Sequence, residues 1–348
     1  MTVRPRVSVI IPARNEAATI VACVRSVLAH DVAGGIEVVV ADGRSSDDTA
    51  RLARSAGATV VDNPRRTTPA GLNAALAVAQ GDVIVRFDGH AEMPPGHVNA
   101  CLRALAEEPG AVGVGGWFKI EGRGAWGRAT AAALASRFGV GNPRLRRRPR
   151  PGEGRVEVDT FMLGCWPATA LRAQGGWDER FVRNQDFELN YRLRRAGGRL
   201  VFDPAIWSIY RPRESLWDIG RQYCDYGRFK ALTIVSAPGS IRPRHLAPVA
   251  LFALALAAVV PTTTRLTRAA RAGLALYYAL LAAVTVRSGG GWRTFPVLVT
   301  IHAAWGAGLL AGLATLVMRA RLDDLPGRYA AGRGTGSGDT IVGNTRTR

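Results

Sequence analysis

The stretch VIVRFDGHAE, residues 83 to 92, ends an apolar run with a carboxylate and an imidazole two residues apart. Asp88 and His90 can both bind a metal ion, and Gly89 leaves room between them. A carboxylate combined with an imidazole suits Mn²⁺ or Mg²⁺ better than Ca²⁺. The pattern therefore indicates a divalent-metal site, but an ordinary Asp-Gly turn followed by a surface histidine has the same sequence.

A cation at this place would allow the chain to bind an anionic ligand such as a nucleoside diphosphate. A carboxylate about 4 Å from a phosphate is repelled by roughly 4 kcal/mol at an effective dielectric constant of about 20. A divalent ion between the two groups reverses the sign of this interaction. It also stabilises the charge that develops when a diphosphate leaves.

Asp186 is the second chemical candidate, in NQDFELNYRLRRAGGRL (184–200). Leu189 and Leu193 predict an amphipathic helix, with Asp186 and Glu188 in its first turn. Acidic residues there complement the helix dipole, which is a sufficient structural reason for both. A carboxylate at this position is also well placed to take a proton from a hydroxyl group.

Alternating β and α elements are expected to position these residues. Continuous apolar runs predict strands at 7–13, 36–42, 58–63 and 82–88, and Asn15 is expected to cap the first of the helices between them. Such runs are typical of strands covered on both faces, so we expect an α/β fold with a doubly wound, mostly parallel sheet. Asp42 and Asp88 would lie at its carboxyl edge, where ligands bind.

Several common nucleotide-binding motifs are missing from the sequence. No GxGxxG follows the first predicted strand, and no GxxxxGK[ST] occurs. The sequence therefore argues against a standard dinucleotide-binding fold and against a P-loop. The four cysteines include no CxxC pair, which argues against a zinc site and favours a reducing compartment.

The chain is strongly basic, with a net charge of +19, and only Lys119 and Lys230 among its 46 basic residues are lysines. A genomic coding bias would explain the preference for arginine. An anionic partner such as phosphate or an acidic membrane surface would explain the excess over acidic residues. The arginine-rich segment 142–155 has no accompanying nucleic-acid recognition motif, so we do not expect a nucleic-acid partner.

Three apolar stretches follow residue 245. Residues 246–261 form 16 residues without a charge, 273–286 form 14, and 295–318 form 24. At ~1.5 Å per residue the first spans about 24 Å and the last about 36 Å, against a hydrocarbon core of about 30 Å. The last is expected to cross a membrane, with the second beside it, while the first is either a short span or an interfacial segment.

These features divide the chain into a domain at 1–240, a membrane anchor at 241–320 and a disordered tail at 321–348. The N-terminus has no secretory signal pattern and leads directly into a strand. Arginines in both loops and in the tail leave the orientation open. If the first stretch does not cross, the loop with Arg265, Arg268 and Arg271 lies with the tail on the cytoplasmic side, which is the arrangement we favour.

The motifs VSVIIPARNEAATI, VVVADGRSSDDTA and GLNAALAVAQGDVIVRFDGHAE together resemble the nucleotide-sugar domain of inverting family 2 glycosyltransferases, which has the GT-A fold. NQDFELNYRLRRAGGRL and RQYCDYGRFKA extend the resemblance to about residues 5–235. Within the family, the combination is most similar to membrane-anchored glucosyltransferases of succinoglycan-type exopolysaccharide synthesis.

The resemblance implies roles for individual residues. Asp42 would bind the uracil or ribose of a nucleotide-sugar donor, and Pro12 and Glu16 would shape the nucleotide pocket. Asp88 and His90 stand in the place of the family's Asp-x-Asp motif and would hold Mg²⁺ or Mn²⁺. The histidine departs from the family pattern, which leaves the choice of metal open.

The resemblance also places Asp186 as the general base, with Gln185 where the family often has an acidic residue. Gln222 and Arg228 would close over the donor diphosphate. Related processive enzymes have Gln-x-x-Arg-Trp at this place, and Asp225 and Tyr226 stand here instead, which argues against processive synthesis.

Gly164 and Trp166 are candidates for sugar contact, because pyranose rings pack on indole faces. Tryptophan is also a common core residue, so the segment GCWPATALRAQGGWDERF (164–181) allows both interpretations.

We therefore expect an inverting, metal-dependent hexosyltransferase at the inner membrane, with its catalytic domain in the cytoplasm. It would transfer glucose from UDP-glucose to a lipid-linked saccharide during exopolysaccharide or cell-envelope glycan synthesis. One alternative is transfer directly to polyprenyl phosphate. Another is a catalytically silent basic membrane protein that binds an anionic polymer.

Overall fold

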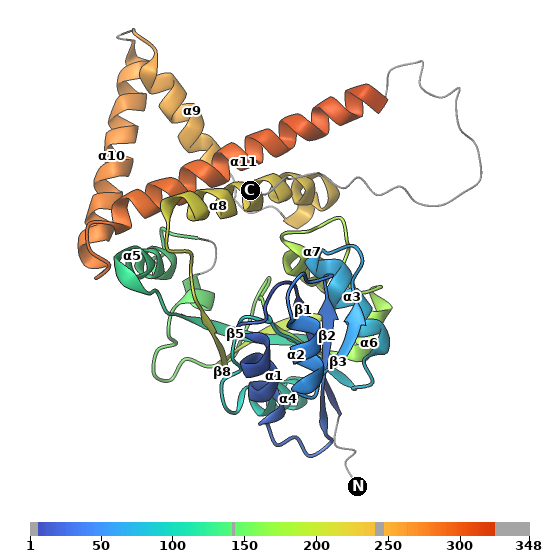
Figure 1. The fold of residues 1–348 in the computed structure, drawn as a ribbon. Helices are drawn as coiled ribbons and strands as arrows, with labels where there is room; N and C mark the ends of the chain where they lie inside the picture. The colour runs from blue at the N-terminus through green and yellow to red at the C-terminus, as the bar shows by residue number, and fades with distance from the viewer. Residues whose placement is uncertain (1–5, 141–142, 241–246, 263, 324–348) are drawn as a thin grey trace.

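The predicted sheet is present, and its order is β3-β2-β1-β4-β7-β5-β8-β6 in the described part of the chain. The computed structural model describes residues 6–140, 143–240, 247–262 and 264–323. The strands are β1 (Val7–Ala13), β2 (Ile36–Asp42), β3 (Thr59–Asp62), β4 (Val83–Arg86), β5 (Ala111–Ile120), β6 (Val156–Glu157), β7 (Cys165–Pro167) and β8 (Arg199–Tyr210). Figure 1 shows the sheet at the centre of the N-terminal part of the molecule.

The N-terminal half of the sheet is parallel and covered on both faces, as the continuous apolar runs predicted. β1 pairs in parallel with β2 and β4, and β2 pairs in parallel with β3. Val9 and Ile11 of β1 enter one hydrophobic cluster, and Ile10 enters another on the opposite face. The covering helices are α1 (Ile20–Leu28), α2 (Thr49–Ser55), α3 (Thr68–Val78), α4 (His97–Glu107), α6 (Ala168–Ala173) and α7 (Gln185–Arg195).

The second half of the sheet is not a simple continuation of this pattern. β7 lies between β4 and β5 and is antiparallel to both, while β5 and β8 pair in parallel. β7 is only three residues long and brings the segment around Gly164 beside β4. This insertion places the later part of the chain, including α7, against the carboxyl edge of β4.

Two sequence-based boundaries differ from the structure. Asn15 does not cap the first helix, because α1 begins at Ile20 after Thr19. Asn15 instead has a left-handed backbone conformation, with φ 56°. β4 ends at Arg86, so Phe87 and Asp88 lie just beyond the strand, although Phe87 N still donates to Ile10 O at 3.1 Å.

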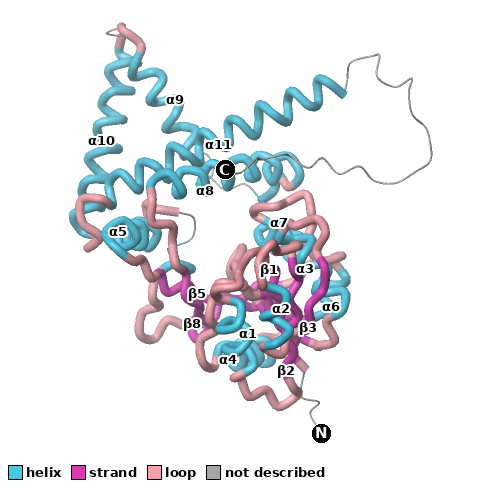
Figure 2. Tube along the Cα trace, in the orientation of Figure 1, coloured by secondary structure: helices cyan, strands magenta, loops and turns pink. Residues whose placement is uncertain are grey.

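A layer of helices follows the sheet domain. It comprises α8 (Leu216–Ser236), α9 (Ala247–Val259), α10 (Arg265–Arg287) and α11 (Thr294–Asp323), with α5 (Gly124–Ala135) and the 3₁₀ turns η1 (Pro143–Arg146) and η2 (Pro238–Ser240) nearby. α9 and α10 form a hairpin that projects away from the sheet domain, whereas α8 and α11 lie beside each other next to it (Figure 1, Figure 2).

Among the described residues, α10 and α11 are the two helices long and apolar enough to cross a membrane, judged by length and composition. α9, with 13 residues, is shorter than a span requires. Most of the predicted disordered tail, from residue 324 onward, lies outside the described residues.

Substituting alanine for Gly164 is expected to destabilise the fold by about 1–3 kcal/mol, because the added methyl group overpacks a filled core. A Cβ atom at this position would clash with the ring of Phe161 and lie 2.9 Å from Trp166. Thermal unfolding in detergent measures the effect. Gly154→Ala is the matched control because no atom lies within 4 Å of its Cβ position, and equal stability of the two variants would contradict the prediction.

Candidate active site

The loops that follow β1 and β2 meet at the carboxyl edge of the sheet and are bonded to each other. Asn15 N donates to Ser45 Oγ at 2.9 Å, and Ser46 N donates to Asn15 Oδ1 at 2.9 Å. Asn15 adopts a positive φ, which asparagine tolerates better than most residues. The two loops therefore form one structural unit on the side where ligands of parallel sheets bind.

Asp42 and Pro12 belong to this edge. The Asp42 carboxylate accepts hydrogen bonds from Ser45 N at 3.1 Å and from Ser45 Oγ at 2.6 Å, so it orders its own loop. Pro12 pairs in register with Ala41, and its Cβ would lie 3.3 Å from a methyl group on Gly71 of α3. Both residues thus lie at the carboxyl edge of the sheet, and their place in a nucleotide pocket stays a prediction.

Glu16 and His90 form a second part of the edge, next to Asp88. His90 Nδ1 lies 3.4 Å from Glu16 Oε1, and Thr19 Oγ1 donates to Glu16 Oε2 at 3.2 Å. The hydrogen bond with Glu16 raises the pKa of His90, and the negative charge of Asp88 adds to this, against the opposing effect of burial. Glu16 and Asp88 thus favour the protonated imidazole, whereas a metal ion would require its neutral form.

Arg86 connects Asp88 to Asp186, and the sequence analysis did not identify it. Its Nη2 donates to Asp88 Oδ1 at 3.1 Å, and its Nη1 donates to Asp186 Oδ2. Arg86 is 6 % exposed and Asp186 is 5 % exposed, so this ion pair is buried. One guanidinium thus brings together two carboxylates that are 98 residues apart in the chain.

The surroundings favour a basic Asp186 carboxylate. Burial raises the pKa of Asp186, and this effect outweighs the opposing effects of Arg86 and of a hydrogen bond from Trp177. Burial works in the opposite direction on Arg86, but Asp186 and Asp88 together raise the pKa of its guanidinium. The arginine therefore stays charged next to a carboxylate that takes up a proton more readily than an exposed aspartate does.

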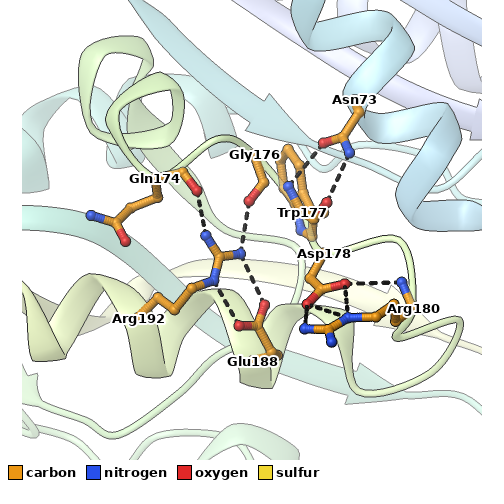
Figure 3. Close-up of polar contacts among 8 residues, drawn as sticks. All are labelled: Asn73, Gln174, Gly176, Trp177, Asp178, Arg180, Glu188 and Arg192. Carbon is orange, nitrogen blue, oxygen red and sulfur yellow. Dashed lines mark hydrogen bonds and ion pairs between the residues drawn. The ribbon is translucent and has the colours of Figure 1, made fainter. Parts of the chain in front are cut away.

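Trp177 holds the other oxygen of Asp186, since its Nε1 donates to Asp186 Oδ1 at 3.2 Å. Figure 3 shows how the loop carrying Trp177 is fixed. Asn73 of α3 accepts from Trp177 N at 2.8 Å and donates to Trp177 O at 2.8 Å. Arg192 of α7 donates to the carbonyl oxygens of Gln174 and Gly176.

Glu188 has a structural role in this network (Figure 3). Its carboxylate accepts from Arg192 Nε at 2.6 Å and from Nη2 at 2.9 Å, one helical turn along α7. Of the two acidic residues predicted in the first turn of α7, Glu188 thus orients an arginine. Asp186, in contrast, contacts Arg86 and Trp177 at the carboxyl edge of the sheet.

α8 covers the start of α7. Asn184 Nδ2, at the residue preceding α7, donates to Tyr226 O at 3.3 Å. Lys230 Nζ lies 3.5 Å from the centre of the Phe187 ring. The helix that carries Asp186 therefore packs directly on the first helix of the C-terminal layer.

The structure separates the two α8 residues predicted to contact the donor. Gln222 Nε2 donates to Tyr226 Oη at 3.0 Å and to Tyr210 Oη at 3.3 Å, on the side of α8 that faces the sheet domain. Arg228 follows Tyr226 by two residues, about 200° around the helix. Its side chain is exposed and its backbone packs on Gly312 of α11, so the structure does not bring Arg228 to the Asp88–Asp186 cluster.

Trp166 and Gly164 lie in the core and not on an open surface. Trp166 is 0 % exposed, with its ring 5.5 Å from that of Phe161 and 5.8 Å from that of Trp177. Gly164 contributes its carbonyl oxygen, which accepts from Arg86 N at 3.0 Å. The indole of Trp166 therefore has no free face for a sugar. Of the two interpretations, sugar contact and core residue, the structure supports the core residue.

The donor atoms at Asp88 and His90 are compatible with a divalent cation. The side chains of Asp88, Glu16 and His90 are 30 %, 27 % and 60 % exposed, so a ligand can reach them. The described residues form no cluster of three or more metal-binding side chains. An open set of one carboxylate and one imidazole suits a cation that completes its coordination with phosphate oxygens and water, as Mg²⁺ commonly does.

A mostly parallel sheet with this acidic edge and a buried carboxylate beside it is a glycosyltransferase domain of the GT-A type. The family model for glycosyl transferase family 2 matches residues 8–168. The succinoglycan biosynthesis protein ExoA of Rhizobium meliloti is 30 % identical over 322 residues, which cover 86 % of this chain and 92 % of that protein. The chain belongs to glycosyl transferase family 2, which confirms the resemblance seen in the motifs.

Two further proteins are similar over much of the chain. A Methanococcus voltae dolichyl N-acetyl-α-D-glucosaminyl phosphate 3-β-D-2,3-diacetamido-2,3-dideoxy-β-D-glucuronosyltransferase is 24 % identical over 241 residues, 66 % of this chain and 74 % of that one. The mannosyltransferase PcManGT from Pyrobaculum calidifontis, solved with GDP-Man and Mn²⁺, has a TM-score of 0.60 and 22 % identity. That alignment covers 90 % of this chain and 88 % of PcManGT, and it supports the fold alone.

Proposed function

We propose that this glycosyltransferase moves a hexose from a nucleotide-sugar donor to a lipid-linked saccharide with inversion at the anomeric carbon. UDP-glucose is the donor to test first, and the product would enter exopolysaccharide or cell-envelope glycan synthesis. The observation that carries the proposal is the Asp88–Arg86–Asp186 array. In this array one guanidinium group joins the buried carboxylate of Asp186 to Asp88 at the carboxyl edge of the sheet, which supports a base close to the donor.

The chemistry assigned to Asp186 is general-base catalysis. Its carboxylate takes the proton of the acceptor hydroxyl while that oxygen attacks the anomeric carbon. The bond from the anomeric carbon to the diphosphate breaks on the opposite face, and its electron pair leaves with the diphosphate. Arg86 and Trp177 each bond one oxygen of Asp186 and so hold its orientation.

The remaining residues at the edge hold the donor. Asp42, Pro12 and Glu16 would shape the nucleoside pocket, and Asp88 and His90 would hold Mg²⁺ or Mn²⁺. When bound, this cation neutralises charge on the leaving diphosphate. Gln222 would approach the donor from α8, on the face that it shares with Tyr226.

Two observations support a lipid-linked acceptor. α7, which carries Asp186, packs on α8 of the C-terminal helical layer, so an acceptor held at a membrane has a short path to the base. One relative is a succinoglycan biosynthesis protein, and the name of another describes transfer to a dolichyl-phosphate-linked sugar. α10 and α11 support membrane association, and we place the protein at the inner membrane with the catalytic domain on the cytoplasmic side, where nucleotide sugars are made.

Donor hydrolysis and transfer measured with a panel of nucleotide sugars, in Mn²⁺ and in Mg²⁺, test the proposal. We expect a single preferred donor, no activity in a chelator, and a product with inverted anomeric configuration by NMR. Comparing polyprenyl phosphate with a polyprenyl-diphosphate-linked saccharide as acceptor separates the proposal from direct transfer to the lipid. A protein that hydrolyses no donor and transfers nothing would instead be the silent anionic-polymer binder.

Replacing Arg86 with methionine is expected to lower kcat on the order of 100-fold, because an unanchored Asp186 loses its alignment. Arg86→Lys keeps the charge but cannot bond both carboxylates with one planar group, so its kcat should be intermediate. Steady-state kinetics measure both variants, with the larger change expected in kcat and a smaller one in the KM for the donor, because Arg86 also bonds Asp88.

A matched control separates positioning from stability. Arg155→Met removes an arginine paired with Asp203 at 2.6 Å, away from this cluster, and should leave kcat unchanged at a comparable loss of stability. The double variant Arg86→Met with Asp186→Asn should be no slower than Asp186→Asn alone. Additive losses in the double variant would show that Arg86 does not act through Asp186.

A further inference from the structure

α8 and α11 run parallel to each other, and glycines bring their backbones into contact. Along the pair, Gly220 faces Thr300, Gly227 faces Leu309 and Gly312 faces Arg228, so the contact follows both helices in register. A Cβ added to Gly227 would lie 2.7 Å from Leu309 N, and one added to Gly312 would lie 2.7 Å from Arg228 O. Because the two helices are held parallel and in close contact, they have the same orientation relative to a membrane surface.

α8 is unsuited to the interior of a bilayer. It carries five charged residues within 21 positions, namely Asp218, Arg221, Asp225, Arg228 and Lys230. It is also attached to the catalytic domain through Phe187 and Asn184 of the α7 region. Charged side chains at the centre of a bilayer are costly, so α8 stays outside the hydrocarbon core.

The first half of α11 is likewise bound to the protein. His302 Nε2 bonds the carbonyl oxygen of Phe138 at 2.7 Å, in the loop after α5. Val297, Leu298 and Ile301 are buried in a cluster with residues of α5, α8 and α10. These contacts hold the first half of α11 against the same helical layer that includes α8.

The second half of α11 has an open, apolar side. The exposed residues recur at helical spacing along one stripe, and these are Ala307, Leu310, Ala311, Ala314, Val317 and Met318. α8, next to it, exposes Arg228 level with Gly312, and Arg221 and Asp218 nearer its start. An apolar stripe beside arginines fits the boundary between headgroups and acyl chains of an anionic phospholipid membrane.

We infer that α11 lies in the plane of an anionic phospholipid bilayer, with this stripe facing the acyl chains, and does not cross it. This differs from the sequence-based expectation for residues 295–318, which rested on length and hydropathy alone. The inference relies on the proposed membrane association but not on the proposed transfer reaction. The hairpin of α9 and α10, which projects from the pair, remains the part free to insert more deeply (Figure 1).

Depth measurements on labelled α11 test the inference. Ala307, Ala311, Ala314 and Met318 lie on one face over about 16 Å of helix axis. Each is changed to cysteine in a Cys224→Ala background, because Cys23, Cys101 and Cys165 are buried, and is labelled with a fluorophore. The full chain is placed in phosphatidylcholine–phosphatidylglycerol vesicles with lipids that carry quenchers at defined depths.

We expect the four labels to report the same shallow depth, and a label on exposed Arg148→Cys to report water. Depths that change progressively along the helix by about its 16 Å length would show a crossing helix and overturn the inference. Four unquenched labels would also overturn it and would point to a protein partner on the stripe. The readout requires no catalysis, so it is independent of any failure of the transfer assay.

Discussion

Asp186→Asn is expected to reduce hexosyl transfer by about 10²- to 10⁴-fold while donor binding is kept. The asparagine side chain has a similar shape but cannot accept the proton of the acceptor hydroxyl, and a positioned general base contributes about this factor. Because the acceptor hydroxyl then attacks without a base, the loss should appear in kcat. Single-turnover transfer measures the chemical step, and calorimetry with UDP checks donor binding.

The substitution also removes one partner of a buried ion pair, so stability has to be measured beside activity. Breaking such a pair costs roughly 3–5 kcal/mol because it leaves a buried charge without its partner. Asp88 remains bonded to Arg86 in this variant and should limit that cost. Glu188→Gln is the matched control, since it removes the charge that pairs with Arg192 on the same helix, while the amide oxygen can still accept from Arg192 and leave the Trp177 loop in place.

The comparison of the two variants is decisive. We expect Glu188→Gln to lose stability and to keep its transfer rate within a few-fold once folded protein is counted. A folded Asp186→Asn protein that transfers at the parental rate would remove Asp186 as the base. It would then favour the silent-binder alternative or a base elsewhere on the edge of the sheet.

Asp88→Asn is expected to abolish the dependence of donor binding on Mn²⁺ or Mg²⁺ and to lower kcat/KM on the order of 100-fold or more. A divalent ion stabilises several kcal/mol of charge on a leaving phosphate group, and its carboxylate ligand is lost in this variant. Titration of UDP with and without metal measures the first effect. Donor kinetics over a range of metal concentrations measure the second.

Asp82→Asn is the control for this variant. Asp82 precedes β4 at the opposite end of the strand, where its carboxylate accepts from Arg6 N at 3.0 Å. The Asp82→Asn variant should keep the metal dependence of the parent protein. Unchanged metal dependence in Asp88→Asn would mean that the cation is held elsewhere, and the assignment of His90 would then fail with it.

The parallel half of the fold was predictable from local sequence. β1, β2 and β4 are continuous apolar runs. A strand with apolar side chains on both faces is stable only where other elements cover both faces. Their carboxyl ends then share one edge, which is why Asp42 and Asp88 were correctly expected there. The first turn of α7 was also readable, because the spacing of Leu189 and Leu193 and the acidic residues are local signals.

Arg86 carried one signal that sequence analysis could have used, since it is a lone charge within the apolar run 83–87. The sequence around Arg86 did not indicate which carboxylate this arginine pairs with. The antiparallel strand β7 lies next to β4, and the loop around Trp177 and helix α7 pack against the same edge. Long-range pairing of this kind depends on how whole elements pack, and no local pattern around Asp186 specifies a contact with a residue 100 positions earlier.

The C-terminal helices also combine features that the sequence predicts with features that only the tertiary structure determines. Length and hydropathy identify residues 295–318 as an apolar helix, and those quantities are properties of the sequence alone. Whether such a helix is surrounded by lipid or by protein depends on the helix beside it. Gly227 and Gly312 join α11 to the charged helix α8, and only the tertiary structure brings the two together.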